Sequence, residues 1–250
     1  MKKNKYNNIF IAIIIYIIIL YIITSLIEWC AHYYFMHGNG IGSIFKEEDH
    51  IYHHKKTYLS QYNTGPESEL VFRLYALATI LLTIMILIIL SFFWHIIPYF
   101  KYNFSYITFM VIVLLTTLFY FWCWGSIHSR YHNRKIEIYN QISYNLVPYF
   151  SPDVNSPIYK YLFKYHTLHH MNKGESKGNY NIICPLFDYI FGTYTSRVDN
   201  RLHFSKNKPK TKQEIWLSKN QVFDISVFDN NQIKYKLEDS NEWLSFPDDI

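Results

Sequence analysis

The sequence predicts an all-α fold: an integral membrane helical bundle with a histidine-rich cytosolic helical cap that holds a two-metal centre. Three long, uncharged apolar blocks carry the membrane part, because a spanning helix needs about 20 apolar residues. The cap is indicated by histidine, since ten of the 12 histidines fall into four tight clusters that border these blocks or lie in the polar segments after them. Imidazole is the commonest metal-binding side chain, and ten imidazoles are more than one ion can use.

The first apolar block predicts a membrane span over about 8–30. Lysines precede it, as in a signal sequence, but its apolar run is longer than a typical signal core and no small-x-small cleavage site follows. We therefore expect the helix to be retained. The first cluster, His32 and His37, comes directly after it, and a glycine-rich stretch over 38–42 ends the helix.

Two further spans are expected over about 70–95 and 104–125, joined by a short turn as a hairpin. The second cluster precedes this hairpin and the third follows it, so both return to the membrane face where the first span ends. All clusters can therefore meet on one side. Basic residues are frequent in the connections on that side, which favours the cytosol, although the lysines at the N-terminus oppose this orientation.

The remaining chain divides into an interfacial segment, a helix and a tail. Residues 136–161 are amphipathic, aromatic and interrupted by prolines, which is typical of a segment lying along the membrane surface. The fourth cluster lies on 159–170. We expect residues 1–195 to form one membrane-embedded domain, and residues 196–250 to be a polar C-terminal tail with some strand-like alternation.

Helical spacing accounts for three of the four clusters, because residues three and four apart share one face of a helix. The members of the first cluster are five apart, roughly 140° around a regular helix. That pair needs a helix end, a π-bulge or a break between its members. The metal ligands predicted from the four clusters are His32, His37, His50, His53, His54, His128, His132, His166, His169 and His170.

All-imidazole ligation suits Zn, Cu, Fe or Ni. A structural zinc site closes with four ligands and usually includes cysteine. The three cysteines have no regular spacing, which argues against a zinc ribbon and against a disulfide framework. Two irons therefore fit the ten histidines better, and the isolated His95 and His203 are interpreted as ordinary polar or core residues.

Groups around the ligands should orient them. Glu28 lies four residues before His32 on the same helical face, so we expect it to support that ligand; the alternative is an interfacial anchor. Asp49 and Asn179 are further candidates.

The net charge of +5 is dispersed among acids, which gives nucleic-acid binding little support. No dinucleotide-binding fingerprint is present, because the glycines of 38–42 follow a helix and not a strand.

The clusters resemble those of the fatty acid hydroxylase and sterol desaturase superfamily of membrane di-iron enzymes, whose motif series is HX3-4H, HX2-3HH, HX2-3HH. The start of the first motif, EWCAHYYFMHG from Glu28, is similar to the family's Glu-aromatic-x-x-His pattern. The stretch from Asn179 to Tyr194, NYNIICPLFDYIFGTY, is similar to the family's ending, with Phe187 where tryptophan is usual. The resemblance covers about 25–195, although a single span precedes the first motif where many relatives have two or more.

The resemblance implies an O2-dependent oxidation of a lipid C–H bond, most simply hydroxylation of a fatty acyl chain, a sterol or a related lipid. It implies two Fe ions, for which zinc can substitute in purified material, and O2 as co-substrate. It also implies a separate electron donor, such as a cytochrome b5 or a ferredoxin with its reductase. As a multi-pass membrane protein, the chain would lie in the endoplasmic reticulum of a eukaryote or the inner membrane of a bacterium.

Three alternatives stay open. A lipid or sterol desaturase of the same superfamily would have the same residues. A non-catalytic membrane metal-binding protein or transporter would place ionisable ligands within its spans, whereas these clusters flank them. A catalytically silent relative would have a structural or interaction role.

Overall fold

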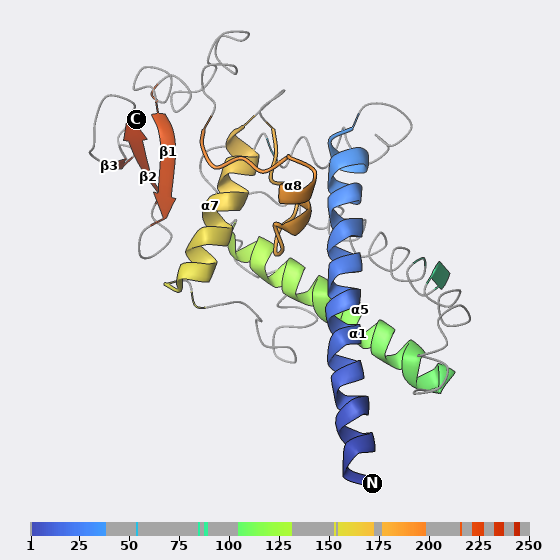
Figure 1. Cartoon of the computed structure of the whole chain (residues 1–250). Helices are drawn as coiled ribbons and strands as arrows, with labels where there is room; N and C mark the ends of the chain where they lie inside the picture. The colour runs from blue at the N-terminus through green and yellow to red at the C-terminus, as the bar shows by residue number, and fades with distance from the viewer. Residues whose placement is uncertain are drawn as a thin grey trace, which may run out of the picture. The chain divides into compact units, whose positions relative to one another are not determined.

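The computed structural model of the chain describes residues 2–38, 54, 85, 88–89, 105–131, 153, 155–172, 177–198, 216, 222–227, 233–237 and 243–245. These residues are mostly helical, in the order shown in Figure 1. The chain divides into two compact units, one made of residues 1–27 and 65–125 and the other of residues 28–64 and 126–250.

The first unit contains most of two long helices, α1 (Lys2–Cys30) and α5 (Tyr106–Tyr131). Tyr16 and Leu20 of α1 pack against Phe109 and Val113 of α5, and each pair is four apart on its helix. The rings of Tyr16 and Phe109 have centroids 5.2 Å apart. Thr24, also buried, donates its hydroxyl proton to the Leu20 carbonyl at 2.8 Å, so its polar group is satisfied within the helix.

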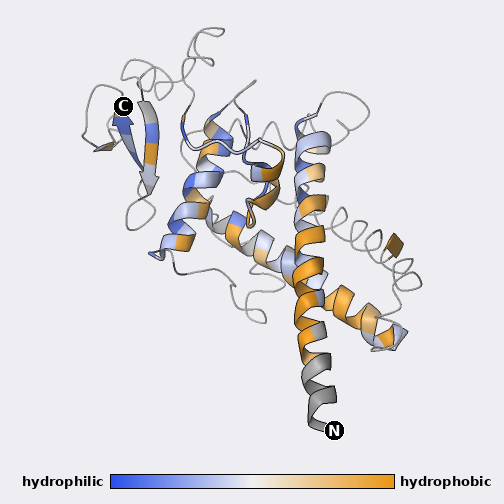
Figure 2. Cartoon of the chain, in the orientation of Figure 1, coloured by the Kyte–Doolittle hydropathy of each residue, from blue (hydrophilic) through white to orange (hydrophobic). Residues whose placement is uncertain are grey.

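Away from this contact, both helices expose isoleucine, leucine and valine side chains over much of their length. The hydropathy colouring marks hydrophobic stretches on both helices (Figure 2). Ile13–Tyr34 and Tyr106–Trp124 are long and apolar enough to cross a membrane. They coincide with the first and third predicted spans. Of the second, over 70–95, only Met85, Ile88 and Ile89 lie within the described residues; they are helical and exposed.

The second unit holds the ends of α1 and α5, a π-helical turn (Ala31–Met36), α7 (Pro157–Met171), α8 (Leu186–Ile190) and a small sheet. α7 has a well-formed start: the Ser156 hydroxyl accepts a hydrogen bond from the Tyr159 backbone N–H at 3.2 Å, and Pro157 occupies the first turn, where no N–H is needed. Residues 132–152, which include most of the predicted interfacial segment, lie outside the described residues.

The sheet corrects the expectation that the fold is all-α. Strands β1 (Val222–Val227), β2 (Ile233–Leu237) and β3 (Trp243–Ser245) pair antiparallel in the order β1-β2-β3. Ile225 and Tyr235 lie opposite each other and are buried, while their neighbours along the strands are polar. Alternation of this kind puts every second side chain on the inner face of a sheet.

The inner face of the sheet packs on α7, where Leu168 and Met171 join Val198, Ile225 and Tyr235 in one cluster of buried side chains. On the polar side, the Lys164 ammonium pairs with the Asp224 carboxylate at 2.7 Å. The segment predicted as a polar tail after residue 195 therefore shares a core with the helix that bears the last histidine cluster. The strand-like alternation in the sequence came from this buried face.

Candidate metal centre

Helix α7 supplies three buried imidazoles, from His166, His169 and His170. Their spacing along the helix turns all three side chains toward one side of it. The opposite side of α7, through Leu168 and Met171, covers the sheet. One helix therefore connects the apolar core of this unit to its histidines.

The first cluster lies on the π-helical turn. The backbone N–H of His37 donates to the His32 carbonyl at 3.1 Å, a hydrogen bond between residues five apart. Such a bond defines a π-helix, whose wider turn brings positions five apart one above the other. The two rings are stacked with centroids 5.0 Å apart. Of the three solutions that the spacing allows, the chain adopts the π-helical one.

The histidines gather in two groups. In each group, one nitrogen from every imidazole lies within 4.8 Å of the others. The first group is His32, His37, His54 and His169, and the second is His128, His166 and His170. Seven of the ten predicted ligands are thus brought together, while His50, His53 and His132 lie outside the described residues. His95 and His203 lie outside them as well.

The two groups are side by side. The rings of His54 and His170, which belong to different groups, are stacked with centroids 4.2 Å apart. His169 is in the first group although its neighbours on the helix face, His166 and His170, are in the second. Consecutive residues of α7 therefore belong to different groups, which follows from the 100° that separates neighbours in a helix of 3.6 residues per turn.

The donor sets fit metal ions. The Nε2 atoms of His37 and His169 are 3.2 Å apart, and those of His166 and His170 are 3.0 Å apart. Two imidazole nitrogens bound to one ion at about 2.0–2.1 Å lie roughly 3 Å from each other at the angles of tetrahedral or octahedral coordination. A histidine-rich group at this spacing can bind a metal ion.

Two of the imidazoles are oriented by backbone carbonyls. His169 Nδ1 is 2.6 Å from the Gly178 carbonyl oxygen, and His32 Nδ1 is hydrogen-bonded to the Tyr180 carbonyl. Because a carbonyl oxygen can only accept, each Nδ1 carries the proton and each Nε2 keeps its lone pair. Burial also lowers the pKa of His169 well below its usual value, which favours the neutral, metal-binding form.

The loop that provides these carbonyls, residues 177–182, is held by the buried carboxylate of Asp188. The backbone N–H groups of Tyr180 and Asn181 donate to its two oxygens, each at 2.9 Å. Three side chains complete the set of five donors: the hydroxyl of Thr193 at 2.6 Å, the indole of Trp29 at 3.2 Å and the phenol of Tyr165. A buried carboxylate is tolerated where its lone pairs are satisfied in this way.

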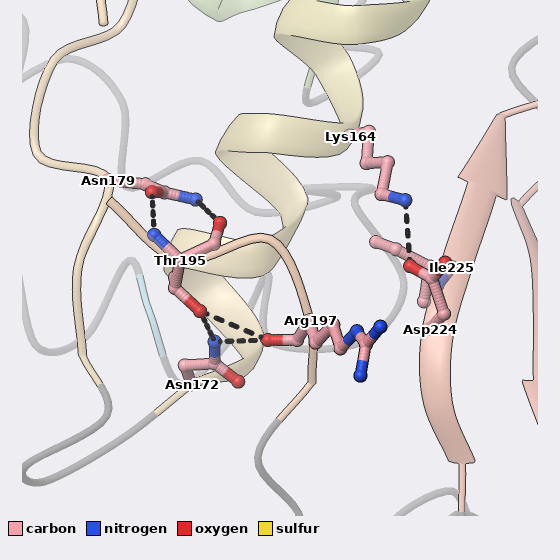
Figure 3. A network of polar contacts seen from close by, with 7 residues as sticks. All are labelled: Lys164, Asn172, Asn179, Thr195, Arg197, Asp224 and Ile225. Atoms are coloured by element: carbon pink, nitrogen blue, oxygen red, sulfur yellow. Dashed lines mark hydrogen bonds and ion pairs between the residues drawn. The ribbon is translucent and has the colours of Figure 1, made fainter. Parts of the chain in front are cut away.

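Asn179, a residue of the same loop, joins it to Thr195 (Figure 3). It adopts a left-handed backbone conformation with φ of 59°, which asparagine tolerates better than most residues. Its amide donates to the carbonyls of Tyr165 at 3.0 Å and Thr195 at 2.9 Å, and its side-chain oxygen accepts from the Thr195 N–H at 2.8 Å. Next to it, a Cβ on Gly178 would lie 2.0 Å from the Thr193 carbonyl oxygen, so glycine is required there.

The predicted supporting residues act on this loop. Glu28 is buried, and its carboxylate accepts from the Ile182 N–H at 2.6 Å and from the Asn181 amide at 3.4 Å. Asn179 acts as just described. Asp49 lies outside the described residues. The sequence patterns did not indicate Asp188 or Tyr165 as site residues. The signal for Asp188 was present, since an acid in the apolar run 186–191 is costly to bury without donors.

An aromatic wall covers the second histidine group. The Tyr131 ring stacks on the His166 ring with centroids 5.2 Å apart, and it also contacts Tyr159 and Phe163. All four side chains are buried. Burial raises the pKa of Tyr131 well above its usual value, so its phenol stays neutral. The wall keeps bulk water away from this side of the histidines.

No family model, no curated protein and no solved structure matches this chain. Its function is therefore inferred from its own residues and their geometry.

Proposed function

We propose that the protein is a membrane-bound di-iron oxidoreductase that uses O2 to oxidise a C–H bond of a lipid, with hydroxylation of a fatty acyl chain, a sterol or a related lipid as the reaction. The observation that carries this proposal is the pair of adjacent histidine groups. Two groups favour two ions, and a donor set made only of imidazole suits a redox-active metal such as iron. The order and spacing of the histidine clusters, similar to those of membrane di-iron hydroxylases, support the same reading.

Within this proposal the ions, when bound, supply the redox chemistry with O2, and the protein supplies the arrangement around them. His32 and His169 present Nε2 lone pairs because the carbonyls of Tyr180 and Gly178 hold their Nδ1 protons. Glu28 and Asp188 fix the loop that carries those carbonyls. The ring of Tyr131 and its aromatic neighbours exclude water, which would otherwise compete with the substrate.

The membrane location is supported by two helices that are long and apolar enough to cross a bilayer. We infer a multi-pass protein with its metal centre at the cytosolic face, where a separate cytochrome b5 or ferredoxin with its reductase would deliver two electrons per turnover. An apolar substrate would then reach the histidines from the bilayer.

The test measures metal and product in the same preparation. The full chain, purified in detergent, should contain two irons per chain, and with a reductant and O2 it should convert a membrane lipid extract into a product heavier by one oxygen. His169→Ala should lose metal and product, because it removes a ligand from the first group. His203→Ala, outside the clusters, is the matched control and should behave like the unaltered chain.

Two outcomes would change the assignment. A product lighter by two hydrogens would make the protein a desaturase with the same site. Full occupancy by a redox-inactive metal, even after expression with added iron, together with no O2 uptake, would leave a non-catalytic membrane metal-binding protein and would refute the enzyme.

A further inference from the structure

Helix α8 exposes an apolar face and buries a face that is partly polar. Phe187 and Asp188 point inward, and Asp188 is fully buried among its five donors. Leu186, Tyr189 and Ile190, which share the other face at positions i, i+3 and i+4, are exposed. A helix on the surface of a water-soluble protein shows the reverse arrangement.

The exposed apolar face continues onto the first turns of α7. Ile158 and Tyr161, three apart, are exposed there, and the Tyr161 hydroxyl is 3.2 Å from the Tyr189 hydroxyl of α8. The two helices therefore form one continuous surface, which we call the α7–α8 face. Its members are Ile158, Tyr161, Leu186, Tyr189, Ile190 and Phe191.

Within the second unit, the α7–α8 face exposes large apolar side chains and the sheet does not. Ile158 is 64% exposed and Ile190 is 59% exposed, whereas no large apolar side chain is exposed among those described in the sheet, at 224–226, 233–237 and 243–245. Scattered exposed apolar residues need no explanation, but a contiguous group marks a surface that is covered by something else. The composition of the group, aliphatic side chains with tyrosines, matches the boundary between hydrocarbon and headgroups in a bilayer.

The α7–α8 face also lies beside the end of an apolar helix that can cross a membrane. Phe191 contacts Trp29 with ring centroids 4.4 Å apart, and Trp29 lies in the last turn of α1, within the candidate span Ile13–Tyr34. A surface next to the end of a span is at the depth where tyrosine and tryptophan rings gather in membrane proteins. Within its unit, the α7–α8 face thus adjoins the last turn of α1.

We propose that the α7–α8 face lies in the surface of the lipid bilayer, with Ile158, Leu186 and Ile190 in the outer hydrocarbon and the hydroxyls of Tyr161 and Tyr189 among the headgroups. This inference rests on the membrane placement proposed above, and it is independent of the metal and of the reaction. It gives the metal-bearing unit its own contact with lipid, through the same α7 and α8 that carry histidines and hold the 177–182 loop.

The test is site-specific photo-crosslinking of the full chain in phosphatidylcholine nanodiscs. A benzoylphenylalanine replaces Ile190 or Ile158 in the α7–α8 face, Ile18 on the exposed side of α1 as the positive control, or Ser245 of β3 as the exposed negative control. Mass spectrometry of the irradiated protein counts phospholipid adducts. Positions 18, 158 and 190 should give several-fold more adduct than position 245.

The outcomes separate this inference from the membrane placement on which it rests. Adducts at position 18 without adducts at 158 and 190 would overturn the inference and leave the span in place. Absence of adducts at every position would overturn the membrane placement too. Crosslinked protein dimers at position 190 would show that a second copy covers the face, and would also refute lipid contact.

A second measurement needs no variant. The unaltered chain is reconstituted with a phosphatidylcholine that carries a photoreactive group on its acyl chain close to the headgroup, and the labelled peptides are mapped. Label should appear in residues 186–191 and be missing from residues 222–227. Equal labelling of the two peptides would contradict the proposal even if the benzoylphenylalanine variants fail to fold.

Discussion

The indole N–H of Trp29 donates a hydrogen bond to the carboxylate of Asp188 at 3.2 Å, joining the end of α1 to α8 across 159 residues of sequence. The same N–H is 3.1 Å from the Thr193 hydroxyl, so it is shared between two acceptors. Through this contact and four other donors, Asp188 connects the helix that leads to His32 with the loop whose carbonyl holds His32.

Asp188→Asn should release metal and destabilise the second unit. The new amide group brings two donors to a place where five donors already converge, and each buried donor left unsatisfied costs about 1–3 kcal/mol. We expect at least about 2 kcal/mol of lost stability from the two or more donors affected. Thermal unfolding and the rate of metal loss to a chelator measure both effects. Asp224→Asn is the matched control, since its half-buried ion pair with Lys164 is expected to contribute only about 1 kcal/mol.

Gly178→Ala should weaken metal binding without touching a ligand. A Cβ there would lie 2.0 Å from the Thr193 carbonyl oxygen, so the backbone must shift and move the carbonyl that holds His169. Loss of such support typically lowers metal affinity by about 10–100-fold. Competition with a chromogenic chelator gives the affinity. Gly192→Ala is the control: its φ of +68° is strained for alanine, but no atom lies within 4 Å of the added Cβ, so affinity should be nearly unchanged.

Two separate substitutions, one in each histidine group, should each lower the metal content of the protein. His37 belongs to the first group and His128 to the second. His37→Ala and His128→Ala should each reduce the bound metal from the two ions per chain that we propose to about one, because three or fewer described histidines of the affected group remain. Elemental analysis of protein made with limiting iron measures this. Two ions retained in either variant would disprove the division into two groups.

Ile225→Ala should loosen α7 from the sheet. Ile225 is fully buried against Leu168 and Met171, and truncating a buried isoleucine costs about 2–5 kcal/mol. The unfolding temperature should fall, and metal should be lost at a lower temperature than in the unaltered chain. Lys234→Ala, on the polar side of the neighbouring strand, should change stability by less than about 0.5 kcal/mol. Equal effects of the two substitutions would mean that the sheet does not stabilise α7.

The buried phenol of Tyr235 in the sheet should make the protein less stable at alkaline pH. Burial raises the pKa of Tyr235 to about 12, above the value of about 10 for a tyrosine in an unfolded chain. A raised folded-state pKa gives a contribution that is complete below about pH 10 and lost as the pH rises toward 12. Tyr235→Phe should therefore remove part of the decrease in stability between pH 10 and 12, as followed by denaturant unfolding at each pH. An unchanged decrease would contradict the buried environment of this phenol.

Patterns of local spacing predicted much of what the structure describes. The apolar blocks anticipated α1 and α5, and the four-residue repeats anticipated the shared face of the histidines on α7. The irregular spacing of His32 and His37 limited that segment to three conformations, one of which is the π-helical turn. These features depend on neighbours in sequence, where periodicity is informative.

Contacts between distant segments could not be obtained in this way. Ile225 and Tyr235 have the alternation of a strand, but nothing in their sequence specifies packing against Leu168 of α7. The five donors around Asp188 come from positions 29, 165, 180, 181 and 193, and their convergence depends on the fold as a whole. Glu28 was selected for its place beside His32, whereas the hydrogen bonds described for its carboxylate reach 153 and 154 residues along the chain.

The two oriented imidazoles are held by main-chain oxygens, and this limits what side-chain scanning can reveal about the centre. Replacing Tyr180 by alanine removes a buried ring that packs on His32 and His169 but leaves its carbonyl in the chain. A scan would therefore attribute the effect to the ring and miss that the backbone carbonyl determines which nitrogen of His32 is protonated. An amide-to-ester substitution at the following peptide bond weakens the carbonyl as an acceptor and removes the Asn181 N–H. A change in the backbone can thus damage the site while all ten clustered histidines are intact. The presence of these histidines in a variant is therefore not sufficient for metal binding.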